Sequence, residues 1–493
     1  MQGTHSRVTV GRRILVTLGA LGLLGALAVP PASAADFTID PKTGEAAQVG
    51  DITNPTKKVP ASCPTFTSEP RAIEAWFNTD DMDYRGYMDP KNQRPWSFAN
   101  KTAQVICGAA KGSTIQIGMY FIRAIGTEER PETDSQMVWN ALRYVNKKRG
   151  VKIEMVLDGG GITSAAGKAS IRKELSDIVN IKWCYNGCFN VNKSSKFPWA
   201  INHEKFVAIS KTNWGTKSKD ANVADGGPAV YSSSGQFARS QVRTYWQEAT
   251  LFYGDRELFN QFNARFEMMQ LCTGKSTGGK NCTKSKLKAA AKAAKTTFTL
   301  KKERGIWVDK TYRHYTDAGR GTTVSFSPQD NFVTDYYTSQ MGNVDCKVDN
   351  KIRIAMYRLT ETRSAKFIEV IGKLKKKGCD VQVLLSQTGG AQTISKVVSK
   401  AIKTAKLGKQ VRCTATPIHT KLILIGPADN NTGRVMMGTA NMTTSGLRYS
   451  EEHVITMDSR RITKADVAED FRHAYGVYLA GWNELNQGSK ACK

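Results

Sequence analysis

The feature of this 493-residue chain that most limits its possible folds is an internal duplication. Residues 202–209 and 418–425 both place a histidine and a lysine two residues apart on an apolar run. Side chains two residues apart share one face of a strand, so each segment presents an imidazole beside an ammonium group. A repeated chemical pair of this kind predicts a repeated domain.

The segments upstream of the two histidines also match. Residues 115–120 (Ile-Gln-Ile-Gly-Met-Tyr) correspond to residues 352–357 (Ile-Arg-Ile-Ala-Met-Tyr), and residues 150–157 correspond to residues 378–385. Between the strands of each half lies a stretch with helical apolar spacing that ends in a basic cluster followed by glycine, which is typical of a helix C-terminus. The order strand, helix, strand predicts a mixed or parallel sheet covered by helices. The two helices are expected at residues 136–148 and 364–377.

A histidine beside a lysine suits a phosphate group. The ammonium supplies positive charge for the non-bridging oxygens, and the imidazole can act as a nucleophile or as a general acid near neutral pH. The chain has six histidines, and two of them occupy these matching positions. The candidate catalytic residues are therefore His203, Lys205, His419 and Lys421.

A second matching segment follows each of these pairs. Residues 438–443 (Gly-Thr-Ala-Asn-Met-Thr) precede Glu452, and residues 232–237 (Ser-Ser-Ser-Gly-Gln-Phe) precede Glu248. An amide such as Asn441 can donate to a phosphate oxygen, and a carboxylate such as Glu452 or Glu248 can fix the tautomer of a histidine. Alone, such segments are typical of ordinary turns, so this interpretation depends on the upstream pairs.

Together these motifs resemble the signature of the phospholipase D superfamily, in which His-x-Lys is followed by a Gly/Ser-x-x-Asn segment and then by Glu. Gln236 stands where the family has asparagine, although its amide can still donate. The family's aspartate five residues after the lysine is missing, because Ser210 and Gly426 occupy those positions, and the tyrosyl-DNA phosphodiesterase branch likewise lacks it. The resemblance implies roles for His203, Lys205, Gln236, Glu248, His419, Lys421, Asn441 and Glu452.

The resemblance also implies an architecture and a reaction. Two similar mixed-sheet α/β domains would pack in a pseudo-twofold arrangement with the active site at their interface. His203 would attack phosphorus to form a phosphohistidine, and His419 would protonate the leaving alkoxide and then activate water or an alcohol. The lysines and amides would stabilise charge on the phosphoryl oxygens, so neither a metal nor any other cofactor is expected.

The N-terminus predicts export. Three arginines precede an apolar stretch at residues 14–29, and the small residues 32–34 suit signal peptidase. We therefore expect a secretory signal peptide and a secreted, extracellular protein, with the Sec and Tat routes both open. No later segment is apolar enough to cross a bilayer.

The ten cysteines all follow this leader, and an even count in an exported protein predicts disulfide bonds. Local pairing favours Cys184 with Cys188 and Cys272 with Cys282. The sequence does not rank the longer pairs. A bond between Cys63 and Cys107 would cross-link the first half, and one between Cys346 and Cys379 would cross-link the second. These pairs leave Cys413 and Cys492.

Length and composition predict two domains. A stretch rich in Gly, Lys and Ala separates the halves, and its short basic helix at residues 286–292 has almost no apolar face to bury. The expected organisation is a signal peptide (1–34), an N-terminal lead-in (35–62), a first phospholipase D-like domain (63–272), a basic linker (273–303) and a second phospholipase D-like domain (304–493).

The chain is strongly basic. Its formal charge of +28 falls to +25 without the three arginines of the leader, which contains no acidic residue. Such a field attracts polyanions, either nucleic acid or an anionic membrane surface, although basic exported proteins can also be basic for solubility or for adhesion to an acidic wall.

We interpret the chain as a secreted, monomeric phospholipase D-like phosphodiesterase that hydrolyses phospholipids. One alternative is an extracellular nuclease or nucleic-acid phosphodiesterase, which the charge favours, although no clear row of aromatics interleaved with basic residues is present. Another alternative is an inactive anion-binding module, against which the retention of both His-x-Lys pairs argues. The aromatic residues before His203 either face the substrate or cover the turn between two cysteines, and they are Trp183, Tyr185, Phe189 and Trp199.

Overall fold

The structure is a computed structural model. It describes residues 38–39, 46–47, 59–66, 68, 70–77, 98–122, 134–160, 165–190, 200–214, 226–237, 245–274, 282–303, 305–310, 314–315, 319–330, 335–386, 394–415, 417–427 and 432–492. The expected signal peptide, most of the lead-in and Trp199 lie outside the described residues.

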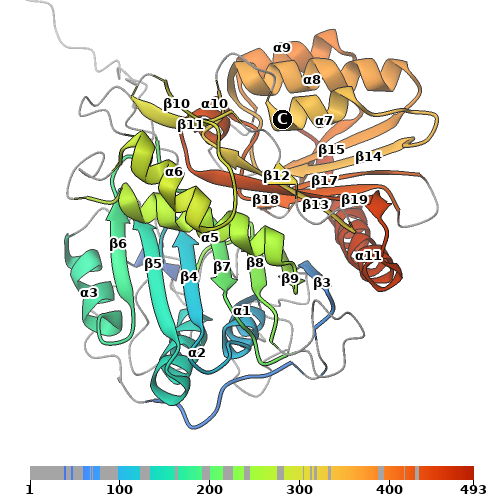
Figure 1. Cartoon of the computed structure of the whole chain (residues 1–493). Coiled ribbons are helices and arrows are strands. Elements are labelled where there is room, and N and C mark those ends of the chain that lie inside the picture. The colour runs from blue at the N-terminus through green and yellow to red at the C-terminus, as the bar shows by residue number, and fades with distance from the viewer. Residues whose placement is uncertain are drawn as a thin grey trace, which may run out of the picture. The chain divides into compact units, whose positions relative to one another are not determined.

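A seven-stranded sheet forms the first half, in the order β3-β9-β8-β7-β4-β5-β6 (Figure 1). Its strands are β3 (Ile73–Phe77), β4 (Thr114–Met119), β5 (Lys152–Asp158), β6 (Asn180–Cys184), β7 (Lys205–Ile209), β8 (Ala229–Ser233) and β9 (Glu248–Tyr253). The helices of this half are α1 (Phe98–Cys107), α2 (Asp134–Arg149), α3 (Ala165–Leu175), α5 (Arg256–Leu271) and α6 (Lys284–Ala293).

A nine-stranded sheet forms the second half, in the order β12-β13-β19-β18-β17-β14-β15-β16-β20. Its strands are β12 (His314–Tyr315), β13 (Arg320–Ser327), β14 (Lys351–Met356), β15 (Asp380–Ser386), β16 (Val411–Thr414), β17 (Lys421–Gly426), β18 (Arg434–Gly438), β19 (Glu452–Ile462) and β20 (Lys490–Ala491). Its helices are α7 (Tyr336–Gly342), α8 (Glu361–Lys376), α9 (Lys396–Thr404), α10 (Thr444–Arg448) and α11 (Ala465–Gln487). Two small antiparallel pairs complete the elements, β1 (Thr38–Ile39) with β2 (Ala46–Ala47) and β10 (Leu300–Glu303) with β11 (Ile306–Asp309).

The two large sheets share one pairing scheme. Strand β4 pairs parallel with β5 and antiparallel with β7, and strand β14 pairs in the same way with β15 and β17. Each strand that begins at the lysine of a His-x-Lys pair therefore lies beside a strand that ends at the methionine of a Met-Tyr segment. The predicted fold class, two similar mixed-sheet α/β domains, is confirmed.

The two helices expected between the first strands of each half are also confirmed. They are α2 and α8, which differ from the predicted ranges by at most three residues at either end. Each helix is followed by a glycine in the left-handed region, Gly150 with φ +63° and Gly378 with φ +95°. Such a glycine lets the chain leave the helix and enter the next strand.

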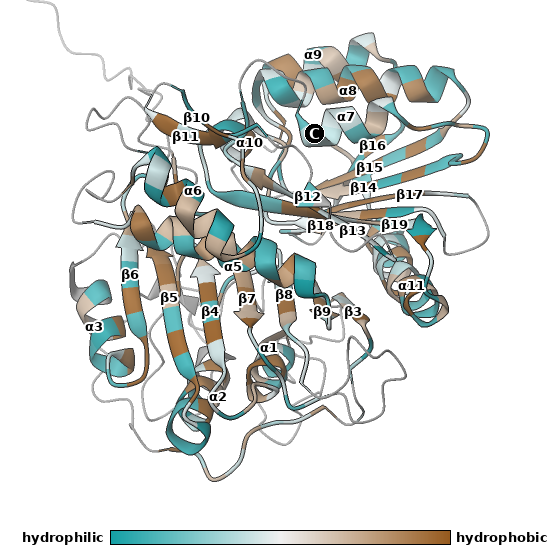
Figure 2. Ribbon diagram, in the orientation of Figure 1, coloured by the Kyte–Doolittle hydropathy of each residue, from teal (hydrophilic) through white to brown (hydrophobic). Residues whose placement is uncertain are grey.

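Three groups of buried apolar side chains hold the layers together. Helices α1 and α2 cover one face of the first sheet, and α7, α8 and α9 cover one face of the second, in agreement with the apolar strands seen in Figure 2. A third group joins the two halves, because it includes side chains from β7, α5, β13, β17 and α11. Examples are Phe206, Phe262, Phe326, Leu424 and Tyr478.

The stretch between the halves, for which the sequence predicts a basic linker with almost no apolar face to bury, contains a packed helix. The expected basic helix is present as α6, but it buries Leu287 and Ala291 in the apolar group that joins the halves. A disulfide between Cys272 and Cys282 ties the start of this stretch to the end of α5. One leucine and one alanine, one turn apart, are enough to pack a helix whose other residues are mostly lysine and alanine.

All ten cysteines form disulfides. The bonds join Cys63 with Cys107, Cys184 with Cys188, Cys272 with Cys282, Cys346 with Cys379 and Cys413 with Cys492. The two local pairs and both longer pairs that the sequence suggested are confirmed, and the remaining two cysteines bond to each other.

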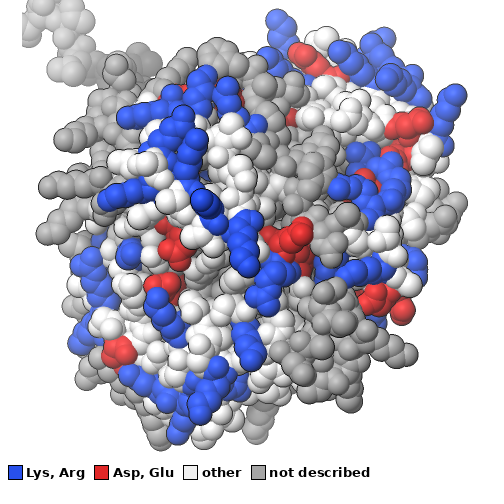
Figure 3. Space-filling view, viewed as in Figure 1, with Lys and Arg blue, Asp and Glu red and all other residues white. Residues whose placement is uncertain are grey.

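Lysine and arginine side chains dominate the face shown in Figure 3. Part of this charge comes from α6, whose exposed lysines are Lys284, Lys286, Lys288 and Lys292. In the part of the chain that the structure describes, no helix combines the length and apolar character needed to span a bilayer.

Candidate active site

The two His-x-Lys pairs lie at the starts of two corresponding strands. Lys205 is the first residue of β7 and Lys421 is the first residue of β17, so each histidine lies just before its strand. The apolar residues that follow are buried and anchor both strands in the core. Both lysines are fully buried, whereas His203 and His419 retain 6% and 5% exposure.

The two histidines meet across the junction of the halves. Their ring centroids lie 6.2 Å apart. The backbone N–H of His203 donates to Glu451 O at 2.9 Å, and the backbone N–H of His419 donates to Trp246 O at 2.8 Å. Each histidine is therefore positioned by the segment that leads into β19 or β9 of the other half.

A carboxylate from the second half orients His203. Its Nδ1 lies 2.7 Å from Glu452 Oε2, and both side chains are buried. Lys205 Nζ donates to the carbonyl oxygen of His203 at 2.7 Å. With Nδ1 engaged, Nε2 is the ring nitrogen of His203 that remains for chemistry.

A backbone carbonyl orients His419. Its Nδ1 lies 2.7 Å from Ser234 O, and because a carbonyl oxygen only accepts, Nδ1 carries the proton. Lys421 Nζ lies 3.0 Å from the same nitrogen and donates to the carbonyl oxygen of His419. Nε2 is again the nitrogen left for proton transfer.

The first-half counterpart of Glu452 is Gln247 rather than Glu248. Ser234 N–H donates to Glu248 O and Thr439 N–H donates to His453 O, so the pairing aligns Glu248 with His453. Instead of holding a histidine ring, Glu248 Oε1 accepts from the backbone N–H of Lys421 at 3.1 Å. The sequence carried a signal for Gln247, because it follows Gln236 by eleven residues, as Glu452 follows Asn441.

The two amides occupy equivalent places. Gln236 lies three residues beyond the end of β8, and Asn441 lies three residues beyond the end of β18. The side-chain carbonyl oxygens of both have no hydrogen-bond partner within the described residues. Both amides therefore keep hydrogen-bonding capacity for a ligand.

Three tyrosines that the motifs did not single out surround the histidines. The Tyr120 ring lies tilted against His203 with ring centroids 5.3 Å apart, while the ring centroids of Tyr357 and Tyr245 lie 4.7 and 5.8 Å from that of His419. Tyr120 and Tyr357 end the repeated Met-Tyr segments, so the duplication already marked two of them. The aromatic residues Trp183 and Phe189, in contrast, are buried in the core, and Phe189 packs on Arg265.

The family model described as the cardiolipin synthase, PLD-like domain matches residues 346–475. This range contains His419, Lys421, Asn441 and Glu452. The second half of the chain therefore matches a PLD-like domain, over 130 of the 493 residues. No curated protein sequence matches the chain.

Several solved structures resemble the fold of this chain at low sequence identity. Phosphatidylserine synthase from Haemophilus influenzae Rd KW20 has a TM-score of 0.50 at 11% identity, covering 80% of this chain and 85% of that one. Yeast tyrosyl-DNA phosphodiesterase has a TM-score of 0.44 at 9% identity, covering 79% and 91%. Nuc from Salmonella typhimurium, a phospholipase D family member, has a TM-score of 0.26 at 16% identity, covering 35% and 97%. At these identities the likeness concerns the fold alone.

Burial shifts the pKa values of the ionisable groups around the two histidines. Burial, then Lys205, Lys421 and His419, hold the pKa of His203 well below its usual value. Burial lowers the pKa of Lys421 to about 7, although Glu248 and Glu452 oppose this shift. Burial also raises the pKa of Glu452 well above its usual range. A bound phosphodiester would supply the negative charge that favours the cationic forms of these lysines and histidines.

A network of fully buried, hydrogen-bonded polar side chains links the two halves. His453 Nδ1 lies 2.5 Å from Glu204 Oε2, and His453 Nε2 lies 2.6 Å from Ser232 Oγ. Arg265 Nε donates to Glu204 Oε1 at 3.1 Å. Serine, histidine and glutamate are in hydrogen-bond contact here, but all three are buried, so we assign them to holding the halves together.

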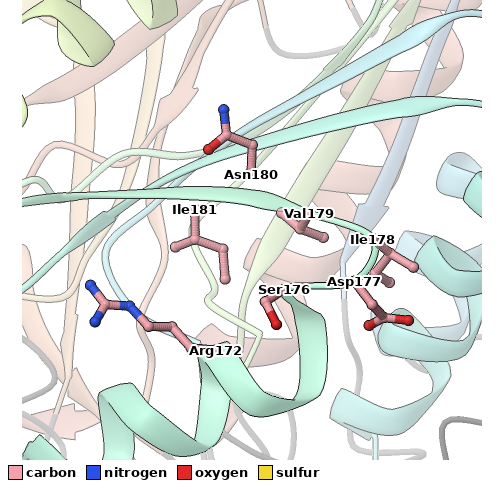
Figure 4. Close-up of a pocket in the computed structure, with 7 residues that line it drawn as sticks. All are labelled: Arg172, Ser176, Asp177, Ile178, Val179, Asn180 and Ile181. Carbon is pink, nitrogen blue, oxygen red and sulfur yellow. The ribbon is translucent and has the colours of Figure 1, made fainter.

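A separate pocket lies at the far edge of the first sheet (Figure 4). It is formed by the end of α3 and the start of β6, the edge strand. Its one carboxylate, Asp177, is paired with Arg143 at 2.8 Å. None of the eight predicted residues lines it, so it is distinct from the phospholipase D-like site. Among the described residues, no cluster of His, Cys, Asp and Glu is arranged to hold a metal ion.

Proposed function

We propose that the protein is a secreted phosphodiesterase that hydrolyses phospholipids through a phosphohistidine intermediate. The observation that carries the proposal is the placement of His203 and His419 with ring centroids 6.2 Å apart and with Nδ1 of each ring held by the protein. Each ring keeps Nε2 for the substrate. Two such nitrogens facing one phosphodiester serve as a nucleophile and a general acid.

In the first step, Nε2 of His203 attacks phosphorus, and the bond from phosphorus to the leaving oxygen breaks. His419 gives its proton to that oxygen, so an alcohol departs and a phosphohistidine remains. Glu452 accepts the Nδ1 proton of His203 in a hydrogen bond and stabilises the positive charge that the ring acquires. In the second step, His419 takes a proton from water, the water oxygen attacks phosphorus, and the phosphorus–nitrogen bond breaks to release a phosphomonoester and His203.

The lysines and amides would meet the charge on the phosphoryl oxygens. Lys205 and Lys421 are fully buried, which strengthens their interaction with an anion compared with lysines in water. The side-chain amide N–H groups of Gln236 and Asn441 would donate to the same oxygens. Because these groups supply charge and hydrogen bonds, we expect turnover to continue in excess chelator.

The expected signal peptide and the five disulfides, which suit an oxidising compartment, support an exported enzyme. A basic surface that would bind an anionic membrane supports phospholipid as the substrate. The same surface supports the second candidate, an extracellular nucleic-acid phosphodiesterase. The charge does not distinguish these two polyanions.

One assay separates the candidates. The purified protein is given phosphatidylcholine, plasmid DNA or bis(p-nitrophenyl) phosphate, each with EDTA present. Release of choline supports the phospholipase, and nicking of DNA without choline release supports the nuclease. No turnover of any substrate contradicts both and leaves the anion-binding module. Loss of activity in EDTA that zinc or calcium restores would contradict the metal-free mechanism.

A further inference from the structure

The two halves of the site differ at one pair of equivalent positions. Tyr120 and Tyr357 each follow the strand that pairs with a catalytic lysine strand, and the next residues are Phe121 and Arg358. Phe121 is buried and packs edge-on against Tyr120, with ring centroids 5.2 Å apart. On the His419 side, the same position carries a cation.

Arg358 is held close to His419 through Tyr357. Its guanidinium lies over the Tyr357 ring at 4.8 Å, and Nη2 donates to the Tyr357 hydroxyl at 3.2 Å. Tyr357 also contacts His419, and the centroids of these two rings lie 4.7 Å apart. The positive charge of Arg358 contributes to lowering the pKa of both His419 and Lys421. The guanidinium therefore lies one aromatic ring away from the general acid.

Arg358 lacks a counter-charge. No carboxylate pairs with it within the described residues, and its Nε is buried without a hydrogen-bond partner. Each of the two catalytic lysines, in contrast, lies in the field of Glu452 and of one further glutamate. A partly buried guanidinium with unused donors is suited to a planar anion such as a carboxylate or to a phosphate.

From this placement we propose that Arg358 selects substrates whose leaving alcohol carries a second anionic group, either a carboxylate or a phosphate. The inference rests on the proposed function, in which His419 protonates the leaving oxygen. The leaving oxygen must lie within hydrogen-bond reach of His419, so a substituent a few bonds farther out on that alcohol would reach the neighbouring guanidinium. An anionic head group would thus be preferred over a neutral or cationic one.

The test compares two phospholipids that differ by a single carboxylate. Phosphatidylserine and phosphatidylethanolamine are presented in the same neutral detergent micelles, and kcat/KM is measured for each from the phosphatidic acid released. We expect the wild-type protein to favour phosphatidylserine, and Arg358→Gln to lower the ratio of the two kcat/KM values roughly tenfold. Arg358→Lys keeps the charge without the planar fork, so its ratio should lie between the two.

Arg256→Gln is the matched control, because it also removes one positive charge but lies exposed at the start of α5. Its ratio should equal that of the wild type, which excludes an effect of overall charge on micelle binding. A second pair, cardiolipin and phosphatidylglycerol, tests a phosphate in place of the carboxylate.

An unchanged ratio in both Arg358 variants, with bis(p-nitrophenyl) phosphate still hydrolysed, would overturn the role of Arg358 and leave the proposed function intact. Absence of turnover by the wild type on every substrate would overturn both.

Discussion

Glu452 of the second half holds Nδ1 of His203 of the first half at 2.7 Å, so the orientation of His203, the proposed nucleophile, depends on both halves. The reciprocal backbone bonds from His203 to Glu451 and from His419 to Trp246 fix the two segments against each other. The chemistry of the site therefore depends on the junction between the halves as much as on the two His-x-Lys pairs.

Glu452→Gln should lower kcat roughly 100-fold, because the amide still accepts the Nδ1 proton but no longer stabilises the positive charge on the ring. Burial raises the pKa of Glu452, so the wild-type rate should rise with pH as this carboxyl loses its proton. The variant should lack that rise. Glu469→Gln, on the exposed side of α11, is the charge-matched control. Equal pH–rate profiles for Glu452→Gln and wild type would contradict this role.

Lys421→Met should abolish turnover and yet stabilise the fold at pH 6. The pKa of Lys421 is lowered to about 7 in the folded protein, so below pH 7 the folded state bears a buried charge that the unfolded state exposes to water. This cost is fully present below the folded pKa and disappears as pH rises toward the unfolded pKa of about 10.4. Urea unfolding should show a gain on the order of 1–3 kcal/mol at pH 6 that shrinks by pH 9.

Lys366→Met, on the exposed face of α8, provides the comparison for Lys421→Met. Its free energy of unfolding should follow that of the wild type at both pH values. A Lys421→Met protein that is less stable than wild type at pH 6 would show that the ammonium contributes net stability to the empty site.

Arg265→Met should destabilise the protein by about 3–5 kcal/mol, because it removes the guanidinium that pairs with the fully buried Glu204. Arg265 also donates to the backbone oxygen of Ser327, which would lose that bond. Arg256→Met at the exposed start of the same helix should change stability by no more than about 0.5 kcal/mol. Equal unfolding midpoints in urea for both variants would show that this buried hydrogen-bond network does not help to hold the halves together.

Much of this architecture follows from the duplication. Repeated strand and helix patterns specify the parallel pairs β4–β5 and β14–β15 and their covering helices, since these depend on apolar periodicity that is local in the chain. The five disulfides likewise agree with the suggested pairs, although the long Cys413–Cys492 bond depends on β16 and β20 lying side by side. That contact is tertiary, and no local pattern specifies it.

Other features could not be read locally. The choice between the adjacent Gln247 and Glu248 is made by the pairing with β8, and the eleven-residue spacing from Gln236 is the one sequence signal that indicates Gln247 as the counterpart of Glu452. Burial of Leu287 depends on the apolar group that joins the halves, which a nearly polar helical pattern does not reveal. Arg358 lies near His419 because both side chains contact the Tyr357 ring. This contact is tertiary, so no sequence motif predicts it.

The order in which the two histidines act gives the most direct test. A substrate with an activated aryl leaving group needs little protonation, so His419→Ala should still form a phosphohistidine at His203 and then stall, because no base remains to activate water. His203→Ala should form no adduct, and each variant should lose at least about 10³-fold in kcat on a lipid substrate. Mass spectrometry without acid treatment locates the phosphorylated residue. The adduct is predicted on His203, in the wild type and in His419→Ala, and an adduct found on His419 would contradict the assigned roles.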